Sequence, residues 1–368
     1  MKPAILSLWI FCFLPFVLQA QVSVPAAKPA KMETPTPDSE ERREMTRVQI
    51  LLDRANFRPG KIDGLGGEFT QKAADRYFQA NGLESGMRLD TTQIPEPYTT
   101  HTLTEEEMGW IGKTASSPPE QAKLKRMPYA DGWELVAEMF HCDLGFIKEL
   151  NPDLVSAGLA AGTIVRVPDV PPFRMADVLA LEKTRATEAK ARKAAAEAAA
   201  SPAPQENEAA VSDGSPAPDP TPQPTPAATP PPLNNRLVLL REPRIIEVYD
   251  AEDRMIACFP CTPGSSSIPV PLGMWKVTSN ILMPYFRYDK SVLKTGVRSE
   301  TAYNIPPGPN NYVGIVWIGI NRRSVGMHGT NNPDQIGRNQ SSGCIRLANW
   351  DAFLLAQLVE KGTPVEVR

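Results

Sequence analysis

A proline-rich segment, residues 201–232, constrains the fold more than any other feature of this sequence. It contains 11 of the 38 prolines in the chain and no aromatic residue. Proline fixes its φ angle and has no backbone N–H, so this segment is predicted to be an extended linker rather than part of a helix or sheet. In polyproline geometry it could reach on the order of 100 Å. The length of 368 residues suggests two or three domains, and this linker divides them.

An alanine-rich stretch, residues 173–200, precedes the linker. Alanine has the highest helix propensity, and Glu, Lys and Arg are scattered through the stretch. We predict a helix here that has little apolar face to bury and serves as a solvated spacer.

The first 20 residues are typical of a secretory signal peptide. Lys2 supplies the positive start, residues 4–18 form an apolar run, and Ala20 offers a small residue at the cut. The run is short for a membrane span, and no later segment reaches the roughly 18 apolar residues that a span needs. We therefore expect an exported protein of the periplasm or cell envelope, with no membrane span.

The charge distribution argues against a nucleic-acid partner. The formal net charge is −3, and basic residues are not massed on any one segment. Residues 21–41 are rich in Pro, Ala, Lys and Thr and are predicted to be disordered.

Residues 42–94 are predicted to form a small α-helical domain. Apolar residues recur at helical spacing from Val48 to Ala55, a turn-rich loop follows at residues 59–64, and Thr70 is a plausible N-cap for a second helix. The words Val-Gln-Ile-Leu-Leu-Asp, Pro-Gly-Lys-Ile-Asp-Gly and Tyr-Phe-Gln-Ala-Asn-Gly-Leu resemble the peptidoglycan-binding helical domain of cell-wall hydrolases. The alternative is a structural helical unit that binds nothing.

Residues 127–169 resemble a LysM glycan-binding module of the α+β class. Two helical patterns lead into Asn151-Pro152, and residues 161–168 are predicted to be a closing strand. The Gly-Asp that usually precedes the first helix is reversed here, as Asp131-Gly132. His141 and Cys142 lie between the two helices and are interpreted as packing residues.

Residues 235–368 are predicted to form a mainly-β domain with one late helix. Five apolar runs separated by turns are expected to be strands, and Asn349 is expected to be the N-cap of a helix that carries Phe353, Leu354 and Leu358 on one face. The five runs are residues 237–240, 245–249, 255–259, 274–278 and 313–320.

The stretch from His328 to Arg346 contains the pair that can carry chemistry. His328 is the only histidine after residue 141, and Cys344 follows Ser342-Gly343. In nucleophilic acyl transfer an imidazole takes the thiol proton and the thiolate attacks a carbonyl. Glycines beside the pair allow close backbone approach and can turn N–H groups toward a developing oxyanion.

These residues carry a resemblance to the YkuD-type L,D-transpeptidase catalytic domain over residues 235–368. The matching words are Met-His-Gly-Thr at 327–330, Ile-Gly-Arg at 336–338 and Ser-Ser-Gly-Cys-Ile-Arg at 341–346, with support from residues 271–275, 307–311 and 362–365. Many members have His before Gly-Cys, whereas this chain has Ser342. That departure bears on substrate contacts more than on the chemistry.

The resemblance implies a mechanism. Cys344 would attack the amide after the third residue of a peptidoglycan stem peptide, expel D-alanine and form a thioester. An amine on a neighbouring stem, or on a wall-linked protein, would then resolve the thioester. With wall-binding modules at the N-terminal end, the linker would be a tether between a wall-binding end and a catalytic end. The resemblance implies no cofactor and no metal.

The resemblance also assigns roles to individual residues. His328 would be the base and then the acid, and the carbonyl of Gly329 would orient its imidazole. The N–H groups of Gly343 and Cys344 are candidate oxyanion donors. The candidates for substrate contact are Thr330, Ser341, Ser342 and Arg346, of which Arg346 could pair with a stem carboxylate or form a structural salt bridge.

Two alternatives to transpeptidation remain open. The same fold could hydrolyse the thioester, acting as a carboxypeptidase or amidase, or the chain could be a non-catalytic wall-binding protein. Cys258 and Cys261 form a Cys-x-x-Cys, but the fifteen residues between His328 and Cys344 do not resemble the spacing of a zinc ligand pair. We expect no catalytic role for Cys258 and Cys261, and their redox state stays open. The aromatic residues of the segment 280–312 suit either a lid over the site or a packed loop.

Overall fold

The computed structural model describes residues 34–200, 233–264, 269–291, 297–322, 325–338 and 343–368. The predicted signal peptide, most of the segment predicted to be disordered, the proline-rich linker, Ser341 and Ser342 lie outside these residues. None of the helices in the described part of the chain combines the length and the apolar character that a membrane crossing requires.

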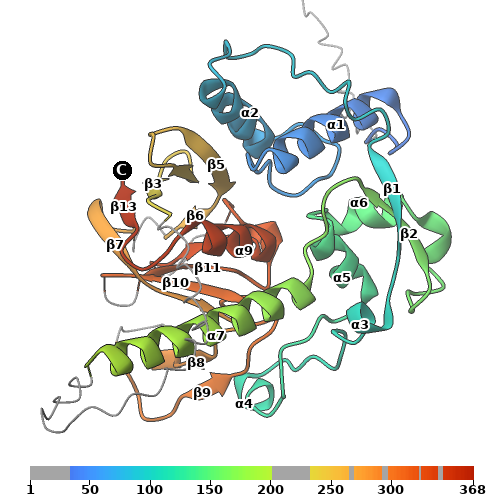
Figure 1. Ribbon diagram of the computed structural model, residues 1–368. Helices are drawn as coiled ribbons and strands as arrows, with labels where there is room; N and C mark the ends of the chain where they lie inside the picture. The colour runs from blue at the N-terminus through green and yellow to red at the C-terminus, as the bar shows by residue number, and fades with distance from the viewer. Residues whose placement is uncertain (1–33, 201–232, 265–268, 292–296, 323–324, 339–342) are drawn as a thin grey trace, which may run out of the picture. The chain divides into compact units, whose positions relative to one another are not determined.

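A mainly-β domain follows the linker, as predicted, and its centre is one large sheet (Figure 1). Among the described residues the strand order is β5-β4-β3-β13-β7-β10-β11-β12-β6. Most neighbours are antiparallel, whereas β13 pairs with β3 and β11 with β12 in parallel. The bounds are β3 Arg236–Leu240, β4 Ile245–Tyr249, β5 Met255–Pro260, β6 Thr262–Pro263, β7 Gly273–Leu282, β10 Val316–Ile320, β11 Gly326–His328, β12 Ile345–Arg346 and β13 Pro364–Val367. All five predicted strands are therefore present; β4 has the predicted bounds, and the other four differ at one or both ends.

The segment 280–312 contributes the end of β7 and a separate two-stranded sheet. Its strands are β8 (Phe286–Tyr288) and β9 (Tyr303–Ile305), which pair antiparallel. The rings of Phe286 and Tyr288 lie within 5.4–5.5 Å of that of Tyr312. A lid function for this segment stays a prediction.

Helix α9 (Asn349–Leu358) packs against β10 and β11 (Figure 1). The prediction that Asn349 caps this helix is wrong, because Ala348 occupies the N-cap position and no side chain caps the helix. The Asn349 side chain is instead fully buried. Its amide forms hydrogen bonds with residues far away in the sequence. These bonds satisfy several buried polar groups at once, whereas a cap would satisfy only the helix end.

Two helices form the first part of the described chain: α1 (Glu40–Arg54) and α2 (Glu68–Ala80). Ser39 caps α1, so the helix begins two residues before the predicted domain start. The prediction that Thr70 caps α2 is wrong, since Gly67 is the N-cap and Thr70 lies inside the helix. The buried Thr70 hydroxyl accepts a hydrogen bond from the Gln49 amide at 3.4 Å.

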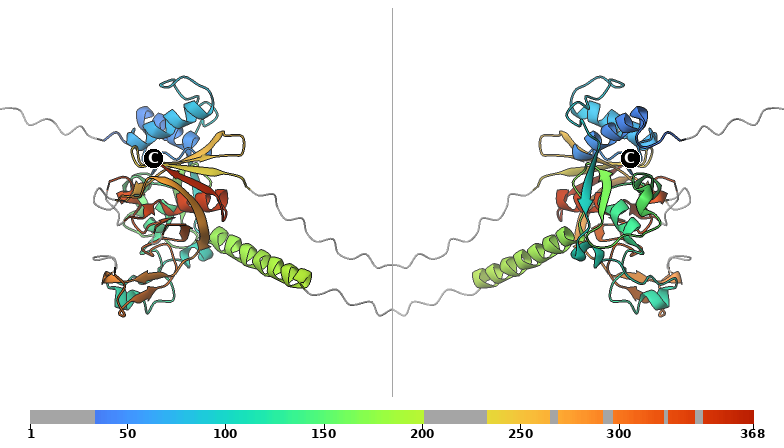
Figure 2. Two further views of the ribbon diagram at one scale, coloured as in Figure 1. Left: turned by 90° about the vertical axis from the view of Figure 1, so that its left-hand side faces the viewer. Right: turned by 90° about the vertical axis from the view of Figure 1, so that its right-hand side faces the viewer.

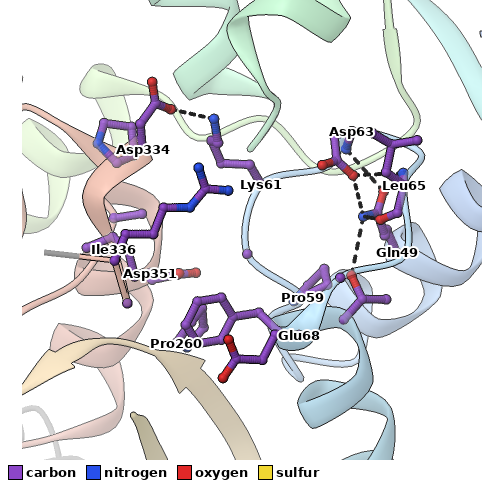
Figure 3. Close-up of a pocket in the computed structure, with 18 of the residues that line it drawn as sticks. Gln49, Pro59, Lys61, Asp63, Leu65, Glu68, Pro260, Asp334, Ile336 and Asp351 are labelled. Carbon is purple, nitrogen blue, oxygen red and sulfur yellow. Dashed lines mark hydrogen bonds and ion pairs between the residues drawn. The ribbon is translucent and has the colours of Figure 1, made fainter. Parts of the chain in front are cut away.

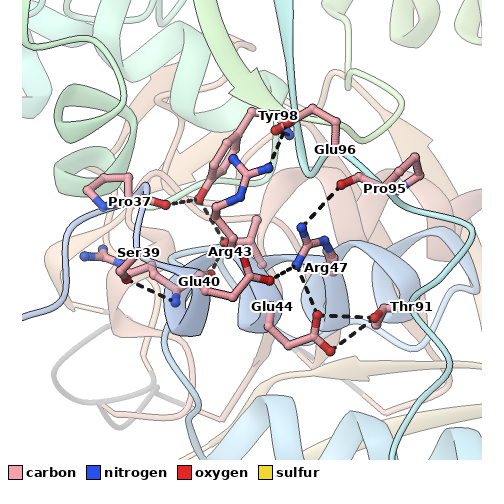
Figure 4. A network of polar contacts seen from close by, with 12 residues as sticks. Pro37, Ser39, Glu40, Arg43, Glu44, Arg47, Thr91, Pro95, Glu96 and Tyr98 are labelled. Carbon is pink, nitrogen blue, oxygen red and sulfur yellow. Dashed lines mark hydrogen bonds and ion pairs between the residues drawn. The ribbon is translucent and has the colours of Figure 1, made fainter.

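The polar face of α1 is attached to residues 91–98 (Figure 4). Arg43 pairs with Glu96 at 2.8 Å, and the Thr91 hydroxyl donates to Glu44 at 3.1 Å. The Tyr98 hydroxyl donates to the carbonyl of Pro37 at 2.8 Å, which also holds the chain that enters α1. Each exposed ion pair of this kind contributes little to the free energy of folding. The packing of the apolar face of α1 therefore contributes most of the stability of this helix.

The predicted closing strand is present as β2 (Ile164–Pro168), and its antiparallel partner is β1 (Tyr98–Thr102). Between them lie α3 (Glu105–Met108), α4 (Pro118–Gln121), α5 (Gly132–Met139), α6 (Leu144–Glu149) and the 3₁₀ turn η1 (Pro152–Leu154). Asn151 exchanges two hydrogen bonds with the backbone of Arg166, at 2.7 and 2.8 Å. The Asn151 side chain therefore links the end of α6 to β2 by hydrogen bonds.

Helix α7 (Met175–Ala200) forms as predicted, but its first turns are not a solvated spacer. Met175 and Val178 are buried, and Phe173 contacts the ring of Phe353 on α9 at 5.8 Å between centroids. Arg185 donates to the carbonyl of Ala356 at 2.6 Å. Beyond this point the described side chains are exposed, and the helix extends away from the sheet (Figure 2).

The described parts on the two sides of the linker contact each other extensively. The N–H of Arg58 donates to the carbonyl of Cys258 at 2.9 Å, and the N–H of Cys258 donates to Asn56 at 3.0 Å. The N–H of Met127 donates to Pro307 at 2.8 Å, and a Cβ on Gly308 would meet the Met127 carbonyl oxygen at 2.2 Å. The two described flanks of the linker thus belong to one compact unit, and the role of the linker as a tether stays a prediction.

Candidate functional site

His328 is the last residue of β11 and is buried. Its Nδ1 lies 2.6 Å from the carbonyl oxygen of Gly329. A carbonyl oxygen can only accept, so Nδ1 carries the proton and, in the neutral ring, Nε2 is left as an acceptor. The ring stacks on Trp317 of β10, with centroids 5.6 Å apart and planes 14° apart. The imidazole is thus held in one orientation and one tautomer.

Cys344 precedes β12, the strand that pairs in parallel with β11. Arg346 lies opposite His328 in this register. Residues paired in register on neighbouring strands share a face of the sheet, so Arg346 lies on the face of His328. The structure therefore places His328 at the end of β11 and Cys344 directly before the strand that pairs with β11.

The Cys344 thiol has its own polar surroundings. Burial raises its pKa, while the N–H of Gly326 and the charge of Arg346 oppose that rise. Burial also lowers the pKa of His328 to about 4; the Gly329 carbonyl opposes this change, and Arg346 adds to it. Both shifts favour the neutral forms of the two side chains, the thiol and the uncharged imidazole.

The backbone around Gly329 is tightly packed. A Cβ on Gly329 would lie 2.2 Å from Oδ1 of Asn349, and one on Gly314 would lie 2.7 Å from Cα of Gly329. Glycine at both positions lets β11, the residues before β10 and the start of α9 approach closely. The side chain of Asn349 therefore packs directly against the backbone of Gly329.

Asn349 connects the site to helix α5. Its Nδ2 donates to both carboxylate oxygens of Glu138, at 3.0 and 3.2 Å, and to the carbonyl of Pro309 at 3.1 Å. The Tyr129 hydroxyl donates to Glu138 at 2.8 Å. Burial raises the pKa of Glu138 to about 8, although the two donors oppose the rise. Glu138, a buried acid of the N-terminal part, is thus connected to the Gly329 backbone through the side chain of Asn349.

The remaining predicted site residues differ in their burial and in their contacts. Gly343 is buried and has a φ of 95°, a left-handed conformation that suits glycine. Thr330 is buried, and its hydroxyl accepts from the N–H of Asn332 at 3.2 Å. Arg346 is half-buried, and burial lowers its pKa. Ser341 and Ser342 lie outside the described residues, so their predicted contacts stay predictions.

Sequence reasoning missed Trp317, Asn349 and Glu138 as parts of this arrangement. Trp317 lies in a predicted strand that leads to His328, and an aromatic residue there was a usable signal. Asn349 was read only as a local cap. Glu138 had no usable signal, because it reaches the site from a helix more than 170 residues away in the sequence.

Within the described residues no group of three or more His, Cys, Asp or Glu side chains has the arrangement of a metal site. Cys258 and Cys261 are both free and buried, and burial raises the pKa of both thiols. Neither is placed to act as a thiolate at neutral pH.

His141 is the other buried histidine with several contacts. Its Nδ1 lies 2.9 Å from Asp53, and its ring stacks on Trp350 of α9 at 5.4 Å. Burial lowers its pKa, against the effect of Asp53. It joins the N-terminal helices to α9, which agrees with its interpretation as a packing residue.

Residues 236–367 match the family model of the L,D-transpeptidase catalytic domain, named YkuD. Among curated proteins, the chain is 27% identical over 132 residues to the Bacillus licheniformis protein named "Putative L,D-transpeptidase YkuD", covering 36% of this chain and 64% of that protein. It is 44% identical over 62 residues to the Bacillus subtilis protein of the same name, covering 17% and 36%. The chain thus spans less than two thirds of the length of these relatives.

Similar solved structures include an L,D-transpeptidase from Mycobacterium smegmatis, with 17% identity and a TM-score of 0.30 over 37% of this chain and 58% of that one. L,D-transpeptidase 3 from Mycobacterium tuberculosis gives 19% identity and a TM-score of 0.30 over 37% and 61%.

Proposed function

We propose, from the premise that residues 236–367 are an L,D-transpeptidase catalytic domain of the YkuD family, that this chain is a cysteine-dependent peptidoglycan L,D-transpeptidase. The observation that carries the proposal is the hydrogen bond from His328 Nδ1 to Gly329. It leaves Nε2 unprotonated on the strand next to Cys344, which is what a general base for a thiol requires.

The first half of the reaction acylates the enzyme. The Cys344 thiol passes its proton to Nε2 of His328 as the sulfur attacks the amide carbonyl after the third stem residue. The C–N bond to D-alanine breaks, the proton moves from His328 to the leaving amine, and a thioester remains. The N–H groups of Gly343 and Cys344 are the proposed oxyanion donors, each worth about 3 kcal/mol if well aimed.

The second half transfers the acyl group. An amine of a neighbouring stem peptide, or of a wall-linked protein, attacks the thioester carbonyl and gives its proton to His328. The C–S bond breaks, and the proton returns to the Cys344 sulfur. Thr330, Arg346, Ser341 and Ser342 are the proposed substrate contacts, with Arg346 pairing with a stem carboxylate. No metal or cofactor takes part in these steps.

The N-terminal part is proposed to bind the cell wall, after export to the periplasm or cell envelope. Residues 42–94 would bind peptidoglycan and residues 127–169 glycan. A cavity of about 570 Å³ on the helical part supports the first assignment. Its lining includes the apolar side chains of Val48, Phe78 and Met87. Apolar surface of this kind, with polar groups beside it, is typical of ligand sites.

The test is to incubate the full chain with muropeptides that carry tetrapeptide stems and to identify the products by mass. Cross-linked dimers that have lost D-alanine support transpeptidation. Tripeptide stems alone identify a hydrolase that uses water as the acceptor, and unchanged substrate identifies a wall-binding protein. Cys344→Ala should abolish turnover, whereas Cys142→Ala, at a buried thiol between α5 and α6, should retain it. Activity that survives Cys344→Ala would contradict the mechanism.

A further inference from the structure

A second cavity, of about 180 Å³, lies between the loop at residues 59–70 and the sheet domain (Figure 3). On the sheet side it is lined by residues 333–338, which lie between His328 and Cys344 in the sequence, and by the start of α9. A Cβ on Gly337 would lie 2.2 Å from the ring of Phe69, so the two loops are in close contact. Lys61 also forms an ion pair with Asp334 across them.

Asp351 is the most unusual residue of this cavity. It is 1% exposed, and neither carboxylate oxygen has a hydrogen-bond partner within the described structure. Its nearest cation, Arg58, is 3.6 Å away and is already paired with Asp53 at 2.5 Å. A buried carboxylate without hydrogen bonds is costly, and burial raises the pKa of Asp351 to about 8. The carboxylate therefore lacks the donors that would favour its ionised form.

Most other charged groups around the cavity are already paired. Lys61 contacts Asp143 and Asp334, Glu68 pairs with Lys72, and Asp63 accepts from the Gln49 amide and from the N–H of Leu65. The exception is Arg338, an exposed side chain that lines the cavity and has no ion pair with any residue that the structure describes. Figure 3 shows Asp351 between Lys61 and Asp334 at one end and Glu68 and Pro260 at the other.

We propose that this cavity binds a small zwitterion, the amino-acid end of a ligand, with its ammonium group on Asp351 and its carboxylate on Arg338. An ammonium group supplies the donors that the Asp351 oxygens lack, and the guanidinium of Arg338 offers a planar fork to a carboxylate. The polar pair is set among Pro59, Phe69 and Ile336, which would exclude water from the remainder of the ligand. The volume suits one amino-acid-sized group rather than a drug-sized ligand.

Two sources share this chemistry: a free amino acid such as the D-alanine released in the proposed reaction, and an ammonium- and carboxylate-bearing end of a stem peptide. The choice between them rests on the proposed function, whereas the binding of a zwitterion does not. Because residues 333–338 lead toward Cys344, occupancy of the cavity is positioned to affect the segment that carries the nucleophile.

Binding is measured by titration calorimetry on the full chain carrying Cys344→Ala, so that no turnover interferes. We expect D-alanine to bind, and D-lactate and D-alaninol, which lack the ammonium and the carboxylate respectively, to bind at least tenfold more weakly. D-alanine binding should also weaken from pH 8 to pH 6, because Asp351 must lose its proton to hold the ammonium. A muropeptide with a free amino-acid end that binds more tightly than D-alanine identifies the stem as the source; one that binds no more tightly identifies the free amino acid.

The variants are Asp351→Asn, which has the shape of the protonated acid, and Arg338→Gln. Each should weaken D-alanine binding at least tenfold, while Arg192→Gln on the exposed face of α7 removes the same charge as Arg338→Gln and should change nothing. Thermal unfolding of the Arg338→Gln protein should match that of its parent, because the side chain is exposed. The proposal fails if D-alanine does not bind, if D-lactate binds as tightly as D-alanine, or if both site variants bind D-alanine with unchanged affinity. The muropeptide assay is independent of this result, so the two proposals can fail separately.

Discussion

Glu138 gives the structure a pH-dependent stability that a single substitution should remove. Burial raises the pKa of this carboxyl to about 8, against the opposing effect of its donors Asn349 and Tyr129. In the unfolded chain a glutamate titrates near 4.3. Between these values the native state holds a proton that the unfolded chain has lost. Stability from this group is therefore complete below about pH 4.3 and is lost as pH rises toward about 8.

The size of the effect follows from the difference in pKa. About 3.7 pKa units, at 1.36 kcal/mol each, correspond to about 5 kcal/mol between pH 4 and pH 9. Glu138→Gln cannot titrate, and its carbonyl can still accept from Asn349 and Tyr129. Its NH₂ group would face Nδ2 of Asn349, which lies 3.2 Å from Oε2, so a small cost of about 1 kcal/mol is expected at low pH.

Urea denaturation of the full chain at pH 5 and pH 9 tests this reasoning. At pH 5 the variant should be slightly less stable than the unaltered protein, and at pH 9 it should be more stable by several kcal/mol. Glu182→Gln, at an exposed position on α7, removes the same charge and serves as the control. If the Glu138 variant and the unaltered protein lose stability in parallel between the two pH values, Glu138 does not hold a proton in the native state.

Three further predictions concern the catalytic pair. Because burial raises the pKa of Cys344, its alkylation by iodoacetamide, measured from peptide masses, should accelerate about tenfold per pH unit from pH 6 to 8.5. An alkylation rate that does not change between pH 5 and pH 8 would instead indicate a thiolate–imidazolium pair. His328→Gln should lower the rate of D-alanine release by about 10²–10⁴-fold with unchanged circular dichroism; a smaller loss would mean that another group is the base. Gly329→Ala should lower turnover more than tenfold, because its Cβ would displace Asn349 and the carbonyl that orients His328; near-normal turnover would show that this carbonyl is not required.

Strands of the sheet domain were readable from the sequence because each buries apolar residues over a short run. β3, β4 and β5 lie next to one another in the sheet, joined by short connections, so local pattern and final structure agree. β1 was missed for the opposite reason. Of its five residues only Tyr98 is buried, and the Thr and His residues that follow carry no apolar alternation. Its position is determined by pairing with β2, more than 60 residues later.

The proposed catalytic pair could be suggested from the sequence because one short motif contains both residues. The supports of that pair could not, since they come from distant segments. Thr70 and Asn349 show why local rules failed: both have the composition of a cap, yet both side chains are used in buried contacts with other elements. A local cap satisfies one backbone N–H, whereas Asn349 satisfies an acid, a carbonyl and the N–H of Ile315. Only the packed structure reveals which use prevails.

The proline-rich segment, which divides the sequence, does not separate two independent bodies, and cutting it should demonstrate this. Buried polar contacts cross between the two flanks at Glu138–Asn349 and at Arg58–Asp351. Separating the flanks would remove these contacts, at about 1–3 kcal/mol for each buried group left unsatisfied.

We expect that a protein in which residues 212–217 are replaced by a specific protease site can be cut completely and still elute as one species in size-exclusion chromatography. D-alanine release should also survive the cut, because Asn349 keeps its contact with Glu138. The unaltered chain treated with the same protease is the control. Fragments that elute separately without denaturant would mean that the linker, rather than the interface, holds the two flanks together. The N-terminal part would then be a tethered wall-binding module, as the sequence alone suggested, and not a structural part of the catalytic unit.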